Sequence, residues 1–80
     1  MDQNIIEIRR IIKNILKKNG IDIKENKFKV YYLSFADLAR EGKYFVEFNS
    51  LRNISVDVIK EIENTGKEED FYLYGGIRSD

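Results

Sequence analysis

Hydrophobic residues recur at helical spacing through the first fifth of the chain. At about 100° per residue they fall on one helix face: Ile5, Ile8, Ile12, Ile15 and Leu16. Asn4 and Glu7 have the spacing of an N-cap and its reciprocal acid, and Asn19 with Gly20 favours a left-handed end. The sequence therefore predicts a helix over residues 4–19 whose isoleucine face enters the core.

Two later segments alternate with period two, which is typical of half-buried strands. These are residues 27–33 and 43–49, and their short connection makes them antiparallel neighbours. Between them, Ser34 and Asp37 have the spacing of a cap, so we expect a short helix over residues 35–41 that Gly42 ends.

A second main helix is predicted from Ser55, with Ile54 and Ile59 as a hydrophobic staple. Its buried stripe is narrow: Val58, Ile59 and Ile62. We expect residues 64–66, Asn-Thr-Gly, to end it, residues 67–70 to form a charged turn, and residues 71–74 to form a third strand.

The predicted fold class is α+β in a single domain over residues 1–80, with the element order α-β-(short α)-β-α-β. Three strands form one sheet, and the two main helices cover one of its faces. A helix that crosses over between the last two strands makes the third parallel to the second. The uncovered face then meets water or a partner.

The composition excludes most of the reactive side chains found in proteins, because the chain has no His, Cys, Trp or Pro. It has no imidazole proton shuttle, no thiolate and no disulfide, and none of its serines has a base linked by a motif. We expect no catalytic residue, no cofactor and no metal. No apolar run approaches the roughly 20 residues of a membrane span, and no basic and apolar leader is present, so we expect a cytoplasmic protein.

The net charge is zero, but the charges are distributed unevenly along the chain. Residues 1–29 carry eight Lys and Arg against four Asp and Glu, whereas residues 54–80 carry three against seven. The two segments have balances of +4 and −4, which bear on partner choice.

Basic side chains form a flank beside the isoleucine face of the first helix: Arg9, Arg10, Lys13 and Lys17. Such a flank could track phosphates or contact an acidic partner. The more common interpretation is a solvated flank, partly neutralised by Asp57 and Glu61 of the second helix, and we favour it.

The carboxylates near the second helix and the turn after it are also interpreted as solvated. They match no metal-binding spacing. A basic surface on a second copy could still meet them, which leaves a homo-oligomer open.

Ten aromatic residues concentrate in the strands. The expected outward set, on the face away from the helices, is Tyr31, Phe45, Tyr72 and Tyr74. The expected inward set is Phe28, Tyr32, Tyr44, Phe48 and Phe71, with Leu73. Outward aromatics could pair across strands, anchor a protein partner or stack bases.

The sequence favours a small non-catalytic protein-binding module, of accessory, inhibitor or immunity type. It would act through the aromatic sheet face and its polarised charge. The alternative is a nucleic-acid-binding domain that uses the basic flank with strand tyrosines.

Overall fold

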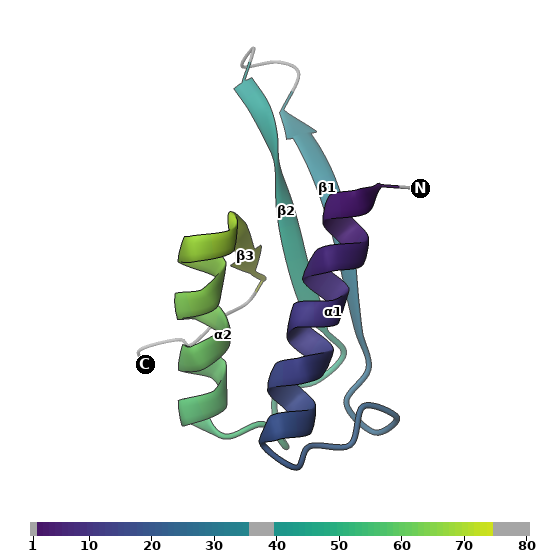
Figure 1. The fold of residues 1–80 in the computed structure, drawn as a ribbon, viewed down its shortest axis with the longest axis vertical. Helices are drawn as coiled ribbons and strands as arrows, with labels where there is room; N and C mark the ends of the chain where they lie inside the picture. Colours follow the sequence, from purple (N-terminus) through teal and green to yellow (C-terminus); the bar gives the residue numbers. More distant parts are fainter. Residues whose placement is uncertain (1, 36–39, 75–80) are drawn as a thin grey trace.

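The computed structural model describes residues 2–35 and 40–74, which contain two helices and a three-stranded mixed sheet (Figure 1). In chain order the elements are α1 (Gln3–Lys18), β1 (Phe28–Phe35), β2 (Arg40–Phe48), α2 (Val56–Glu69) and β3 (Phe71–Leu73). The α+β class and the three-stranded sheet are as predicted.

The first helix begins earlier than Asn4. Its N-cap is Asp2, whose carboxylate accepts a hydrogen bond from the Asn4 backbone N–H at 2.8 Å. The cap prediction was therefore wrong by two residues, because an aspartate two positions upstream offers the same acceptor. The predicted end is confirmed: Gly20 has φ +70°, and the Ile21 N–H donates to the Leu16 carbonyl at 2.9 Å.

The strand order is β1-β2-β3. Strands β1 and β2 are antiparallel, with Tyr31 opposite Phe45, and β3 runs parallel to β2, with Tyr72 beside Phe45. Both orientations are those expected from the sequence. Because β3 has only three residues, the β1–β2 hairpin extends well past it (Figure 1).

The prediction of a short helix over residues 35–41 is wrong for the residues at its two ends, which belong to strands. Its middle, residues 36–39, lies outside the described residues. Phe35 belongs to β1, and residues 40–42 belong to β2. Gly42 is needed for close packing within a strand. A Cβ at this position would come closer than 3.0 Å to the Tyr32 ring. The Gly42 backbone N–H also donates a hydrogen bond to the Tyr32 hydroxyl at 2.9 Å.

The second helix starts as predicted, since the Ser55 hydroxyl accepts from the Val58 N–H at 3.4 Å. It does not end at Gly66 but continues to Glu69, so the expected charged turn is helical. Gly66 is buried inside the helix and faces the Phe71 carbonyl. Asp70 takes the left-handed conformation instead, with φ 60°, and turns the chain into β3.

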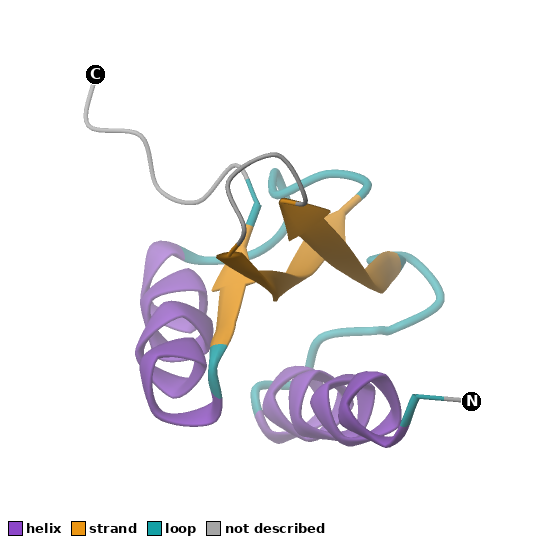
Figure 2. Cartoon of the chain, turned by 90° about the horizontal axis from the view of Figure 1, so that it is seen from above, coloured by secondary structure: helices purple, strands orange, loops and turns teal. Residues whose placement is uncertain are grey.

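One cluster forms the core between the helices and a single face of the sheet (Figure 2). Its four most buried side chains are Ile12, Leu16, Val46 and Ile62. The predicted buried stripes of both helices are confirmed, except that Ile5 is only half-buried. Alternation along the strands leaves the opposite sheet face without a helix among the described residues.

Candidate functional site

An aromatic row crosses all three strands on the sheet face away from the helices. Tyr31 of β1 stacks on Phe45 of β2 with ring centroids 5.8 Å apart, and Phe45 contacts Tyr72 of β3, also at 5.8 Å. The strand register sets these contacts, because the three residues are direct neighbours across the sheet. The structure thus brings together three of the four aromatic residues predicted to point outward.

Exposure differs along this aromatic row. Tyr31 and Phe45 are half-buried by their neighbours, whereas Tyr72 is 51% exposed and Tyr74, the fourth predicted residue, is 58% exposed. Tyr74 follows β3 and extends its pairing, since its N–H donates to the Val46 carbonyl at 2.8 Å. The β3 end of the surface is therefore its most accessible part.

Charged side chains border the aromatic row. The Lys29 ammonium lies 5.5 Å from the Tyr31 ring centroid, and the Lys43 ammonium lies 5.8 Å from that of Tyr72. Lys29 also lies 3.7 Å from the Glu47 carboxylate. This gives an apolar centre with a polar rim, which is the usual anatomy of a protein interface.

The Tyr31 hydroxyl is held in a defined position. It donates a hydrogen bond to Glu47 Oε1 at 3.2 Å. Partial burial, the hydrogen bond to Glu47 and the negative charge of that carboxylate together raise the pKa of Tyr31 above its ordinary value. Tyr31 is therefore a neutral donor at physiological pH.

The inward aromatic set is placed largely as expected. Phe48 and Phe71 are buried, and Phe28, Tyr44 and Leu73 pack at the edge of the core. Tyr32 departs from the prediction, because it is 44% exposed, in the row of the sheet that contains Tyr44 and Phe71. There it lies against Tyr44, with ring centroids 4.9 Å apart.

The four residues of the basic flank of α1 have different surroundings, and all lie apart from the aromatic row. Arg10 forms an ion pair with Glu7, which raises the pKa of Arg10 and lowers that of Glu7. Arg9 turns toward β1, with its guanidinium carbon 5.5 Å from the Phe28 ring centroid. Lys13 and Lys17 are exposed. Because α1 covers the other side of the sheet, these four residues and the outward aromatics do not form one surface.

Glu61 does not neutralise that flank as expected. It pairs with the neighbouring Lys18, and its other oxygen accepts from Asn19 Nδ2 at 3.3 Å. The hydrogen bond from Lys18 is the main cause that lowers the pKa of Glu61. This contact ties the end of α1 to α2. Local pattern could not reveal it, because Lys18 and Glu61 are 43 positions apart.

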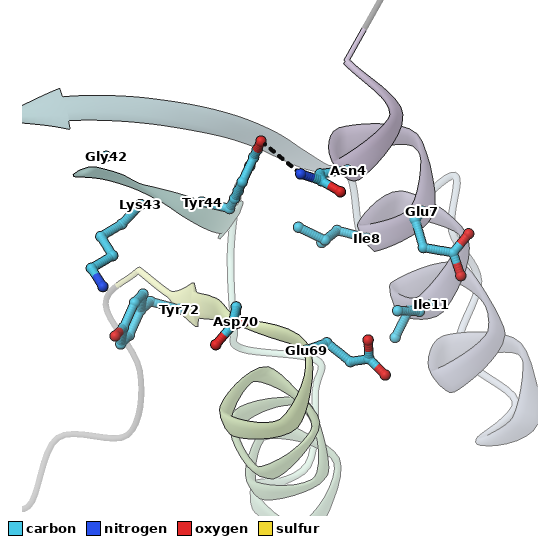
Figure 3. A pocket seen from close by; sticks show the side chains of 10 residues that line it. All are labelled: Asn4, Glu7, Ile8, Ile11, Gly42, Lys43, Tyr44, Glu69, Asp70 and Tyr72. Atoms are coloured by element: carbon cyan, nitrogen blue, oxygen red, sulfur yellow. Dashed lines mark hydrogen bonds between the residues drawn. The ribbon is translucent and has the colours of Figure 1, made fainter.

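A groove of about 410 Å³ opens between the start of α1, the end of α2 and the sheet (Figure 3). Ile8 and Ile11 form part of its wall, and the carboxylates of Glu7, Glu69 and Asp70 lie around it. Among the described residues, no group of three or more acidic, histidine or cysteine side chains is placed to hold a metal ion. The groove therefore has acidic character without an evident ligand set.

Tyr44 connects this groove to the N-terminus of α1. Its hydroxyl donates to Asp2 Oδ2 at 2.9 Å and accepts from Asn4 Nδ2 at 3.1 Å. Loss of water raises the pKa of Asp2, but the hydrogen bonds from Tyr44 and the Asn4 backbone outweigh this effect, so the pKa lies below its ordinary value. These contacts hold the helix start against β2, and the sequence prediction missed them.

The chain was compared with protein-family models, curated proteins and solved structures, and nothing in any of the three matches it. Neither helix in the described part of the chain is long and apolar enough to cross a bilayer. Functional inference therefore rests on the surface itself.

Proposed function

We propose that this chain is a small non-catalytic protein-binding module, of accessory, inhibitor or immunity type. Its binding surface is the aromatic row Tyr31–Phe45–Tyr72 with the adjoining Tyr74. The observation that supports the proposal is a continuous aromatic strip, half exposed at its β3 end, on a sheet face that no described helix covers. Action in the cytoplasm is part of the same proposal.

The chemistry of the aromatic row suits a protein partner. Tyrosine combines a large apolar ring with a hydrogen-bonding tip and loses little rotamer entropy on binding, and it is enriched at binding hot spots. The row is also preorganised, since Tyr31 is fixed by Glu47 and the rings hold one another across the strands. Preorganisation lowers the entropic cost of binding.

The polarised charge supplies steering in this proposal. The basic N-terminal segment contains α1, and the acidic C-terminal segment contains α2 and β3, and these elements lie on opposite sides of Figure 1. A partner with the complementary pattern would approach in a preferred orientation.

Nucleic-acid binding, the alternative, has weaker support. Single-strand binders combine stacking aromatics with a basic groove along the same path. Here Arg9 and Lys13 are on α1, across the sheet from Tyr72. Among the residues that the structure describes, only Lys29 and Lys43 lie close to the aromatic row, and Lys29 is close to a carboxylate.

The test is affinity capture from a nuclease-treated extract of the source cells, with tagged chain as bait. We expect Tyr72→Ala to weaken the affinity for the captured protein by at least about 30-fold, which is the loss typical of a hot-spot residue. The amount of that protein recovered should fall accordingly. Lys60→Ala is the matched control, because Lys60 is also exposed but on α2.

A second bait reverses the charges of Arg10, Lys13 and Lys17. We expect it to weaken capture only modestly, since these residues act at a distance from the aromatic row. Recovery from an untreated extract that is lost after nuclease treatment or in high salt, and that is abolished by the charge reversal but not by Tyr72→Ala, would instead establish the nucleic-acid alternative.

A further inference from the structure

The outer edge of β1 is a long, open strand edge. Strand β1 has eight residues, and within residues 2–35 and 40–74 it pairs with β2 alone, on one side. No hydrogen bond from another described segment reaches its outer side. Natural proteins shorten, bulge or cover such edges to prevent unwanted pairing. The only irregularity here lies near the hairpin tip, between Leu33 and Phe35.

The register determines which backbone groups this edge offers. The Asn49 N–H donates to the Lys27 carbonyl at 2.9 Å, so residues 27, 29, 31 and 33 direct their N–H and C=O groups toward β2. The alternate residues before the register shift direct theirs outward: Phe28, Val30 and Tyr32. Val46, which lies opposite Val30, supports this assignment of directions. Its carbonyl accepts a hydrogen bond from the Tyr74 N–H, on the side of β2 that faces away from β1.

The surroundings of this edge are basic. Arg9 of α1 reaches over the Phe28 ring, and Lys13 follows one turn later, about 40° around the same flank. Lys24 and Lys27, in the segment that leads into β1, are also exposed. Arg10, by contrast, is occupied by Glu7. Arg9 therefore lies beside the start of β1, with Lys13 next on the same helix flank and Lys24 and Lys27 in the segment that precedes the strand.

We propose that β1 accepts an extended acidic segment of a partner protein as a fourth strand. The backbone of Phe28, Val30 and Tyr32 supplies the hydrogen bonds, and Arg9 and Lys13 select for acidic side chains by charge complementarity. The inference rests on the proposed protein-binding function and names the chemistry of the partner. It also gives the basic flank a role that requires no phosphate.

The experiment uses a defined probe, a ten-residue peptide in which valine and threonine alternate with glutamate. Amide hydrogen exchange of the whole chain is measured by NMR with and without saturating peptide. We expect exchange at Val30 and Tyr32 to slow by at least about tenfold, because their N–H groups become paired. Lys29 and Tyr31 are internal controls, since their N–H groups already face β2.

Two protein variants and one modified peptide separate the contribution of charge from that of strand pairing. Arg9→Glu combined with Lys13→Glu should weaken peptide binding by at least about tenfold, whereas Lys60→Glu on α2 should leave it nearly unchanged. A peptide with every second amide N-methylated keeps its charge but loses strand donors, and we expect it not to protect Val30. Circular dichroism of each variant establishes that the fold is retained.

Several outcomes would overturn the edge proposal. They are unchanged exchange at Val30 and Tyr32, protection of these amides by self-association without peptide, or tighter binding of a ten-nucleotide oligothymidine to the same edge. Tyr72→Ala distinguishes this failure from that of the broader function. If peptide binding is absent while capture of a protein still depends on Tyr72, the aromatic surface survives and only the edge proposal fails.

Discussion

Replacement of Gly66 by alanine should destabilise the protein, although alanine is the better helix former. In the interior of α2, removing a glycine would normally stabilise the helix by about 0.8–1.0 kcal/mol. Here a Cβ would come closer than 3.0 Å to the Phe71 carbonyl oxygen and 3.2 Å from two atoms of the Phe71 ring. The oxygen belongs to the backbone at the start of β3, so it cannot rotate away.

The expected magnitude follows from these two opposing effects. Overpacking of this kind costs about 1–3 kcal/mol, and contact with rigid backbone favours the upper end. After subtraction of the helix gain, we expect a net loss of about 1–2 kcal/mol in the free energy of unfolding. Relief of the contact by moving β3 would also displace Tyr72 from Phe45, so the ring signals of both residues should shift.

Urea unfolding followed by circular dichroism measures this effect. With a slope of about 1 kcal/mol/M for a domain of this size, the midpoint should fall by about 1–2 M. Asn64→Ala is the control, because Asn64 is exposed in the same helix and its replacement should stabilise by a few tenths of a kcal/mol. A Gly66→Ala variant as stable as the wild type would refute the close approach of α2 and β3.

Three further predictions concern the fold and its electrostatics. Ile62→Ala empties a fully buried position and should lower the free energy of unfolding in urea by about 2–5 kcal/mol. Ser55→Ala removes the N-cap of α2 and should cost about 1 kcal/mol in the same assay. The pKa of Glu61 is lowered from 4.5 in the folded chain, so its stabilising contribution is present above that value and is lost as the pH falls through the folded-state pKa. Glu61→Gln should therefore lose less stability than the wild type on acidification below pH 4.5, and parallel stability curves would contradict the pairing with Lys18.

The core and the sheet were largely predictable because both depend on repeated spacing. The isoleucines of α1 and the alternating aromatics of β1 and β2 each specify a buried face, and the strand faces then fix the outward row. The placement of Tyr31, Phe45 and Tyr72 on the uncovered face follows directly from this alternation.

The errors arose where a residue has two structural uses. Gly42 and Gly66 were interpreted as helix stops, yet each provides room for a neighbour, the Tyr32 ring in one case and the Phe71 backbone in the other. Asp70, a residue type that tolerates positive φ, took the turning role instead. Such choices depend on tertiary contacts that a local pattern does not contain.

The candidate site was predictable in its membership but not in its arrangement. The sequence offered the aromatics and the basic flank as two surfaces, with no means to say that α1 places Arg9 beside β1 and across the sheet from Tyr72. Contacts between distant residues, such as Tyr44 with Asp2, were missed for the same reason.

Site-specific photo-crosslinking in the source cells would show whether the aromatic sheet face binds a protein. A photoreactive side chain replaces Tyr72 in one version of the chain and Lys60 in another, both exposed positions. We expect a discrete protein adduct from position 72, resistant to nuclease, with little or none from position 60. Nucleic-acid adducts at position 72, or equal yields from both positions, would contradict the assignment of the aromatic sheet face as a protein-binding surface.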